Sequence, residues 1–247
     1  MPKLNTVQMN TGQSGFKFSG VRPENLGAQE YTLVTLILDW SGSVHSFKSE
    51  LEHMIDNTVE ACRRSPRANN LLFRVLLFST IFPNGIQEVH GFKPLADVDQ
   101  SDYKLVDPGG LTPLRDATFD GIVATNAYGK NLANQDFAVN AMEVIVTDGG
   151  DNASAIPASK IAQEIQSAVA DEYLESNLTI LVALNATYCQ QMLDDFHQDA
   201  GIDHFIDVAD AEPKSIAKLG NFITQSISSQ SQSLGTGGPS QNISATI

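Results

Sequence analysis

The residues best suited to chemistry are Asp39, Ser41 and Ser43, which follow an apolar run that ends at Leu38. One carboxylate and two hydroxyls at alternating positions can turn their oxygens to one side of the backbone, and Gly42 relieves the chain between them. Oxygen donors suit Mg²⁺, Mn²⁺ or Ca²⁺, whereas zinc or copper would call for His or Cys, which this stretch lacks. The alternative is that these side chains cap the next helix, as Asp and Ser commonly do.

Two later stretches carry further oxygen donors. The glycine-rich stretch 109–111 leads into Thr112, so a hydroxyl is delivered to the start of a predicted helix. A second apolar run, residues 141–146, is followed by the sequence T-D-G-G, which contains Asp148. In open α/β sheets, ligands bind in the crevice beyond the carboxyl ends of the strands. Asp39 and Asp148 are both predicted at such strand ends.

Together the three stretches resemble the metal-ion-dependent adhesion site (MIDAS) of the von Willebrand factor type A (vWA) family. The family pattern is D-x-S-x-S, then a loop threonine, then an aspartate in T-D-G, and all three occur here in that order. The resemblance implies that Ser41, Ser43 and Thr112 offer hydroxyls to the metal and that Asp39 and Asp148 bind it directly or through water. It also implies an open coordination position, which a carboxylate of a partner protein fills in the family.

The elements that must position these residues alternate between strand and helix. Continuous apolar runs predict strands at 31–38, 71–78, 141–146, 178–184 and 204–208, and a short antiparallel edge strand is expected at 86–89. Apolar residues at helical spacing predict helices at 46–64, 112–128, 157–175, 192–196 and 213–228. The predicted fold is α/β: a doubly wound, mostly parallel sheet with one antiparallel edge strand and helices on both faces, Rossmann-like as in the vWA family.

The chain divides into three predicted parts. Residues 1–30 are polar and glycine-containing, and they are predicted to form a loosely attached N-terminal arm with a possible short β-segment around Phe18. The resemblance implies a single vWA domain over residues 31–228. Residues 229–247 are rich in Ser, Gly and Gln, which predicts a flexible tail.

The composition excludes some classes of partner. Lys and Arg total 15 against 29 Asp and Glu, so the net charge is −14 and neither nucleic acid nor an anionic membrane is an expected partner. The start of the chain lacks the pattern of a signal peptide, and no apolar run is long enough to span a bilayer, which predicts a cytoplasmic location. Two unpatterned cysteines predict neither a disulfide framework nor a metal knuckle.

Three functional hypotheses follow. The first is a non-catalytic module that binds a partner's Asp or Glu through Mg²⁺, or through Mn²⁺ or Ca²⁺. The second, from cytoplasmic proteins similar to the family, is an adaptor or regulatory subunit of an AAA+ ATPase or of a bacterial or phage stress or defence assembly. The third is a metal-dependent hydrolase with His45 as its base. Because Ser41 lacks a G-x-S-x-G context and no base is clearly positioned, we predict that the chain is not an enzyme.

Overall fold

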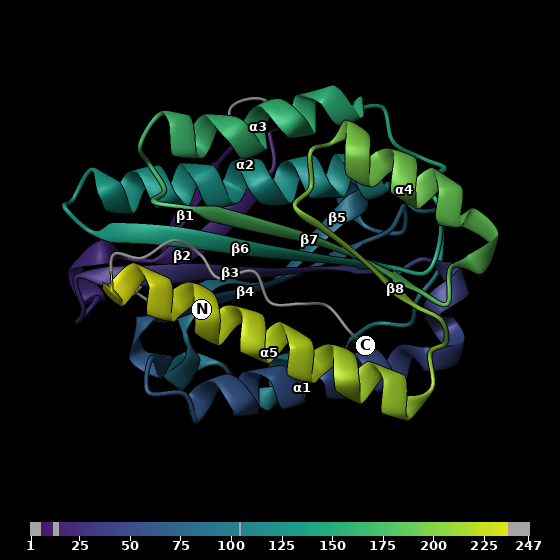
Figure 1. Cartoon of the computed structure of the whole chain (residues 1–247), viewed down its shortest axis with the longest axis horizontal. Coiled ribbons are helices and arrows are strands. Elements are labelled where there is room, and N and C mark those ends of the chain that lie inside the picture. The colour runs from purple at the N-terminus through teal and green to yellow at the C-terminus, as the bar shows by residue number, and fades with distance from the viewer. Residues whose placement is uncertain (1–5, 12–14, 104, 237–247) are drawn as a thin grey trace.

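The computed structural model describes residues 6–11, 15–103 and 105–236, and in these parts eight strands form one sheet in the order β1-β2-β5-β4-β3-β6-β7-β8 (Figure 1). The strands are β1 (Thr6–Asn10), β2 (Lys17–Val21), β3 (Glu30–Asp39), β4 (Leu71–Phe78), β5 (Ile86–Pro94), β6 (Ala138–Thr147), β7 (Asn177–Leu184) and β8 (His204–Val208). The α-helices are α1 (Lys48–Arg63), α2 (Leu114–Ala133), α3 (Ala158–Ala170), α4 (Gln190–Asp199) and α5 (Pro213–Thr236).

The predicted fold class is confirmed. Strands β4, β3, β6, β7 and β8 are parallel, and β5 runs antiparallel to β4 as expected. The sheet continues beyond β5 with β2 and β1, so β5 is not its outermost strand. Helices α1 and α5 cover one face, and α2, α3 and α4 cover the other (Figure 1). The central strands are apolar runs because both of their faces are buried under helices.

Helix α2 packs closely against its neighbours at two glycines. A Cβ atom on Gly121 would lie 2.4 Å from Cδ1 of Ile37 in β3, and one on Gly129 would lie 2.6 Å from Cδ2 of Leu174. A larger side chain at Gly121 would press on Ile37 of β3, a strand that ends at the candidate site, and one at Gly129 would press on Leu174, between α3 and β7.

Two buried titratable side chains lie in the middle of the core under α2. Arg74 of β4 and Glu143 of β6 both pair in register with Thr35 of β3, and both side chains are fully buried. Arg74 donates hydrogen bonds to the carbonyl of Gly121 (2.6 Å) and to the hydroxyl of Thr125 (2.9 Å), both in α2. Its guanidinium carbon also lies 4.4 Å from the centre of the Phe92 ring. These contacts tie α2 and β5 to the central strands.

The described parts of both terminal regions are more ordered than the sequence predicts. Strand β2 falls where the β-segment was expected, but Phe18 is fully buried and Gly20 pairs with Phe92, so the described part of the arm belongs to the sheet. Helix α5 continues to Thr236, so the prediction of a flexible tail is wrong for 229–236. Residues 237–247 lie outside the described part of the chain.

The physical reason for the longer helix is a polar contact with the sheet. Gln230 is buried, and its side-chain amide donates to the carbonyl of Ala141 at 3.2 Å. The amide of Asn140 donates in return to the carbonyl of Gln230 at 2.7 Å. Composition indicated a solvated tail, but Gln230 exchanges hydrogen bonds with Asn140 and Ala141 near the start of β6 instead. Within the described residues, no helix combines the length and the apolar character needed to cross a bilayer.

Replacing Gly91 with alanine is expected to loosen the attachment of β1 and β2. A Cβ atom at Gly91 would lie 2.0 Å from the backbone carbonyl oxygen of Ser19, so β2 must shift. We expect a loss of about 1–3 kcal/mol in the free energy of unfolding, the usual range for overpacking. Urea unfolding would measure this loss, and hydrogen exchange would locate it in residues 17–21.

The matched control is Gly27→Ala, because a Cβ atom there meets no atom within 4 Å. Equal stability and equal exchange in the two variants would contradict a tight contact between β2 and β5.

Candidate metal centre

The candidate site lies where the order of the strands reverses. From β3 the chain proceeds to β4 on one side and later to β6 on the other, so the carboxyl ends of β3 and β6 adjoin a topological switch point. The parallel register pairs Leu38 with Val146, which places Asp39 beside Thr147 and one residue from Asp148. Two aspartates that are 109 positions apart in the sequence therefore end on neighbouring strands.

Hydrogen bonds join four of the five predicted metal ligands. Oδ1 of Asp39 accepts from the backbone N–H of Ser41 at 2.8 Å. The hydroxyls of Ser41 and Ser43 lie 3.1 Å apart, and Ser43 donates to Oδ1 of Asp148 at 2.7 Å. Thr147 donates to Oδ2 of Asp39 at 2.6 Å, so the oxygen atoms form one continuous polar cluster.

The capping alternative does not account for the serine hydroxyl. Ser41 stands at the N-cap position of a short 3₁₀ helix, Gly42–Phe47, but its side chain makes no capping hydrogen bond. Its hydroxyl instead contacts that of Ser43. The backbone geometry is that of a helix start, while the hydroxyl oxygens face the aspartates.

The fifth predicted ligand, Thr112, lies on the adjoining loop. The backbone N–H of Gly42 donates to the carbonyl of Gly110 at 3.2 Å, which brings this loop against the serine stretch. Gly110 has a φ of +77°, and a Cβ atom there would lie 2.7 Å from the hydroxyl of Thr80, so only glycine fits. The N–H of Thr112 donates to the side-chain oxygen of Asn152 at 2.7 Å, which anchors it beside the stretch that follows Asp148.

The electrostatics of the cluster leave negative charge without a partner. Burial raises the pKa of Asp39 to about 6, although hydrogen bonds from Thr147 and Ser41 lower it. Burial also raises the pKa of Asp148. Among the described residues, neither aspartate forms an ion pair with a Lys, Arg or His. Two adjacent buried carboxylates with neutral hydroxyls between them fit a divalent cation, which would supply the missing positive charge.

The possible metal donors of the candidate site are a mixed set of carboxylates and hydroxyls. In the part of the chain that the structure describes, no group of three or more His, Cys, Asp or Glu side chains could hold a metal ion. The candidate site has only two carboxylates, and its other donors are hydroxyls. Such a set matches a hard cation better than a metal that prefers nitrogen or sulfur.

Trp40 supports the site from inside the protein. Its side chain is fully buried, and its indole N–H donates to the carbonyl of Val106 at 2.7 Å. Its own carbonyl accepts from the N–H of Gly109 at 3.0 Å. Trp40 thus holds the stretch from Val106 to Gly109 beside the metal loops, and it is not part of an exposed partner surface.

Sequence reasoning missed several supporting residues. Thr147 braces Asp39, Asn152 holds Thr112, and Ser79 and Thr80 bind the glycine loop. Thr147 had a visible signal, since it precedes Asp148 directly. The others act through side-chain contacts between segments far apart in the sequence, and a single sequence gives no sign of such contacts.

His45 is exposed on the 3₁₀ helix, and among the described contacts no hydrogen bond joins its ring to Asp39 or Ser41.

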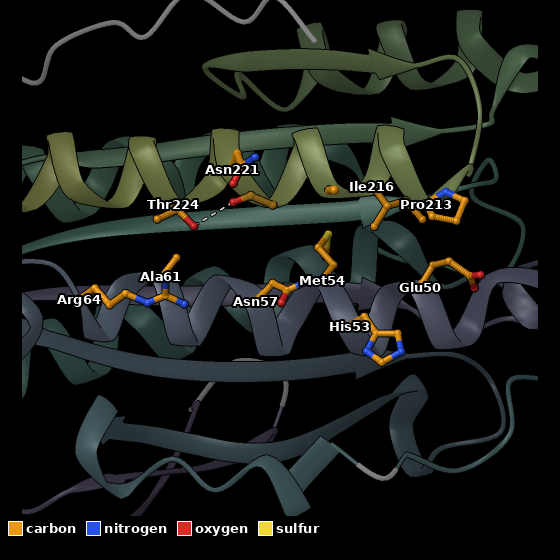
Figure 2. A pocket seen from close by; sticks show the side chains of 12 residues that line it. Glu50, His53, Met54, Asn57, Ala61, Arg64, Pro213, Ile216, Asn221 and Thr224 are labelled. Atoms are coloured by element: carbon orange, nitrogen blue, oxygen red, sulfur yellow. Dashed lines mark hydrogen bonds between the residues drawn. The ribbon is translucent and has the colours of Figure 1, made fainter.

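A hollow of about 470 Å³ lies between α1 and α5, lined by side chains such as Met54 and Thr224 (Figure 2). It shares no lining residue with the candidate site.

Comparison with known proteins gives structural neighbours but no sequence family. No family model matches the chain, and no curated protein matches it. The pilus adhesin SpaC from Lactobacillus rhamnosus GG, in its open conformation, superposes with a TM-score of 0.58 at 11% identity, over 86% of this chain and 31% of the adhesin. Proximal thread matrix protein 1 from the mussel byssus superposes with a TM-score of 0.55 at 14% identity, over 81% of this chain and 46% of that protein.

A further structure of the byssus protein has a zinc-occupied MIDAS motif. It superposes with a TM-score of 0.50 at 13% identity, over 81% of this chain and 46% of that protein. The chain thus spans about a third of the adhesin and less than half of the byssus protein. At these identities the likeness concerns the fold, which is vWA-like.

Proposed function

We propose that this chain is a non-catalytic protein-interaction module that binds a carboxylate of a partner protein through a divalent metal ion. The residues that would hold the ion are Asp39, Ser41, Ser43, Thr112 and Asp148. The observation that carries the proposal is the pair of buried aspartates, hydrogen-bonded into one cluster with two serines and lacking any ion pair among the described residues. A neighbour of the same fold with a zinc-occupied MIDAS motif adds support.

The donor set explains why a carboxylate would be the ligand. Only two of the five donors carry charge, so a divalent ion held by them, with neutral hydroxyls completing the set, retains affinity for another anionic oxygen. The oxygen donors favour Mg²⁺, with Mn²⁺ or Ca²⁺ as substitutes. Bound there, the ion supplies the positive charge that attracts the partner. The chain's own residues would hold it beside the carboxyl ends of β3 and β6.

The wider role is also part of the proposal. Catalysis needs a nucleophile or a base in contact with the reacting atoms, and the exposed ring of His45 is the best available base. We therefore favour binding over hydrolysis. An AAA+ ATPase, or a bacterial or phage stress or defence assembly, stays a prediction for the partner, as does the cytoplasmic location. The net charge of −14 argues against nucleic acid and anionic membranes.

Mn²⁺ as a probe tests this function directly. Water bound to Mn²⁺ enhances proton relaxation, so acetate that enters the open position should displace water and lower the enhancement of the Mn²⁺-loaded protein. Thr112→Val, which removes one hydroxyl at constant shape, should weaken Mn²⁺ binding about tenfold or more, the scale expected when a group that supports a metal is lost. If acetate leaves the enhancement of the loaded wild type unchanged, carboxylate binding through the metal is wrong.

A further inference from the structure

Most of the exposed large apolar side chains gather around the candidate metal centre. Among the described residues, those exposed by more than 40% are Ile81, Val106, Leu111, Val169, Tyr188 and Met192. Five of the six follow the carboxyl ends of strands or lie on the loops there, and only Val169 lies elsewhere, on α3. We call these five (Ile81, Val106, Leu111, Tyr188 and Met192) the apolar rim. Exposed apolar side chains that cluster in this way commonly mark an interaction site.

One side of the apolar rim is built on the glycine loop. Leu111 precedes the candidate ligand Thr112, and its N–H donates to the hydroxyl of Thr80 at 2.8 Å. Ile81 follows Thr80, and its Cγ2 would lie 3.0 Å from a Cβ atom at Gly110. Val106 is fixed through its carbonyl, which accepts the indole N–H of buried Trp40. These residues are held by the same contacts that position the metal loop.

The other side of the apolar rim follows β7. The hydroxyl of Tyr188 donates to the backbone carbonyl of Asp148 at 3.1 Å, and the Tyr188 side chain is still largely exposed. The sulfur of Met192 would lie 2.3 Å from a Cβ atom at Gly150, two residues after Asp148. Because β7 and β4 lie on opposite sides of β3 and β6, the apolar rim flanks the candidate site from both directions.

The charge beside Met192 limits the choice of partner further. A hollow of about 240 Å³ opens between α2 and α4 and is lined by Leu114, Met192 and Phe196 together with Asp195 and Asp199. Arg115, the one basic residue in this lining, is paired with Asp151 at 3.4 Å. A partner that contacts this side therefore gains from Lys or Arg near its acidic residue, and the net charge of −14 favours the same arrangement.

We propose that the partner is a protein segment in which one Asp or Glu is flanked on both sides by apolar residues, with basic residues beyond them. The acidic residue would meet the metal, the apolar side chains would cover the apolar rim, and the basic residues would face the acidic hollow. This inference rests on the proposed function, since it names the ligand of the same site. Apolar anchors around a central polar contact are also where binding energy concentrates in interfaces.

Two peptides test the inference with the full chain in Mn²⁺. One has a central aspartate, two leucines on each side and a terminal lysine at each end, and the other has serines in place of the leucines. We expect the leucine peptide to bind about tenfold tighter or more, the scale that burial of several apolar side chains gives. Leu111→Ser and Met192→Ser should each remove much of this difference, while Val169→Ser, an exposed apolar position on α3, should leave it unchanged.

The possible outcomes separate the two proposals. Equal binding of both peptides in Mn²⁺ would overturn the apolar rim as a docking surface and would leave metal-dependent carboxylate binding intact. Absence of binding by either peptide would contradict both proposals. If Val169→Ser weakened the leucine peptide as much as Leu111→Ser does, the contact would not be specific to the apolar rim, and the inference would fail.

Discussion

Replacing Glu143 with glutamine is expected to stabilise the protein at alkaline pH by on the order of 4 kcal/mol and to change little at pH 5. The side chain is fully buried beneath α2, and burial raises its pKa from an ordinary 4.5 to about 8, although Arg74 lowers it. The folded state thus binds the proton more tightly than the unfolded chain does. Glutamine has the shape of the protonated acid and cannot ionise, so it escapes the cost of a buried charge.

The sign of the pH dependence follows from linkage. Because the pKa of Glu143 is raised in the folded state, its protonation favours folding. The stability that this side chain contributes is fully present below about pH 4.5 and is lost as the pH rises through about 8. Urea unfolding of wild type and Glu143→Gln between pH 5 and 9 would measure the divergence. Glu24→Gln, at an exposed position, is the control and should run parallel to wild type. Parallel curves for Glu143→Gln would show that this carboxyl is already ionised in the folded protein.

Replacing Asp39 with asparagine is expected to raise the stability of the metal-free protein while abolishing its response to metal. Burial raises the pKa of Asp39 from 3.8 to about 6, so its ionised form costs roughly 2–3 kcal/mol above pH 6. Asparagine keeps an oxygen to accept the N–H of Ser41. The hydroxyl of Thr147 can then donate to the carbonyl of Gly149, which already lies 2.8 Å away.

Binding sites often destabilise the unliganded fold, because the charges that bind the ligand repel each other in its absence. In EDTA at pH 7.5, thermal unfolding should therefore show Asp39→Asn above wild type. In Mg²⁺, wild type should rise and the variant should not. Lower stability of Asp39→Asn in EDTA would indicate that the carboxylate serves as a structural brace and not as a strained metal ligand.

The α/β architecture and the shared position of Asp39 and Asp148 at neighbouring strand ends could be predicted from the sequence. The central strands are long apolar runs because both of their faces are covered, and that pattern is visible without coordinates. Asp39 and Asp148 stand directly after two such runs, so their common edge follows from the parallel arrangement. The resemblance also implied that Ser41, Ser43 and Asp148 lie close together, and the structure joins them by hydrogen bonds. Metal binding by these residues stays a prediction.

The rest depended on register and on contacts between distant segments. Arg74 and Glu143 sit inside apolar runs, but their common alignment with Thr35 appears only once the strand register is known. The burial of Gln230 against β6 could not be predicted for the same reason, and composition alone indicated a solvated tail. The burial of Trp40 could not be predicted either, because the pattern D-x-S-x-S does not specify the residue at that position.

The most direct test of the metal centre is a titration with Mn²⁺ followed by electron paramagnetic resonance, in which free Mn²⁺ gives the signal. We predict that wild type removes one equivalent of Mn²⁺ from solution and that Asp39→Asn, Asp148→Asn and Ser43→Ala each weaken or abolish this binding. Asp207→Asn, an exposed carboxylate near the carboxyl end of β8, should bind as wild type does. If the wild type binds no Mn²⁺, or if Asp207→Asn loses binding as fully as Asp39→Asn, the metal centre assigned here is contradicted.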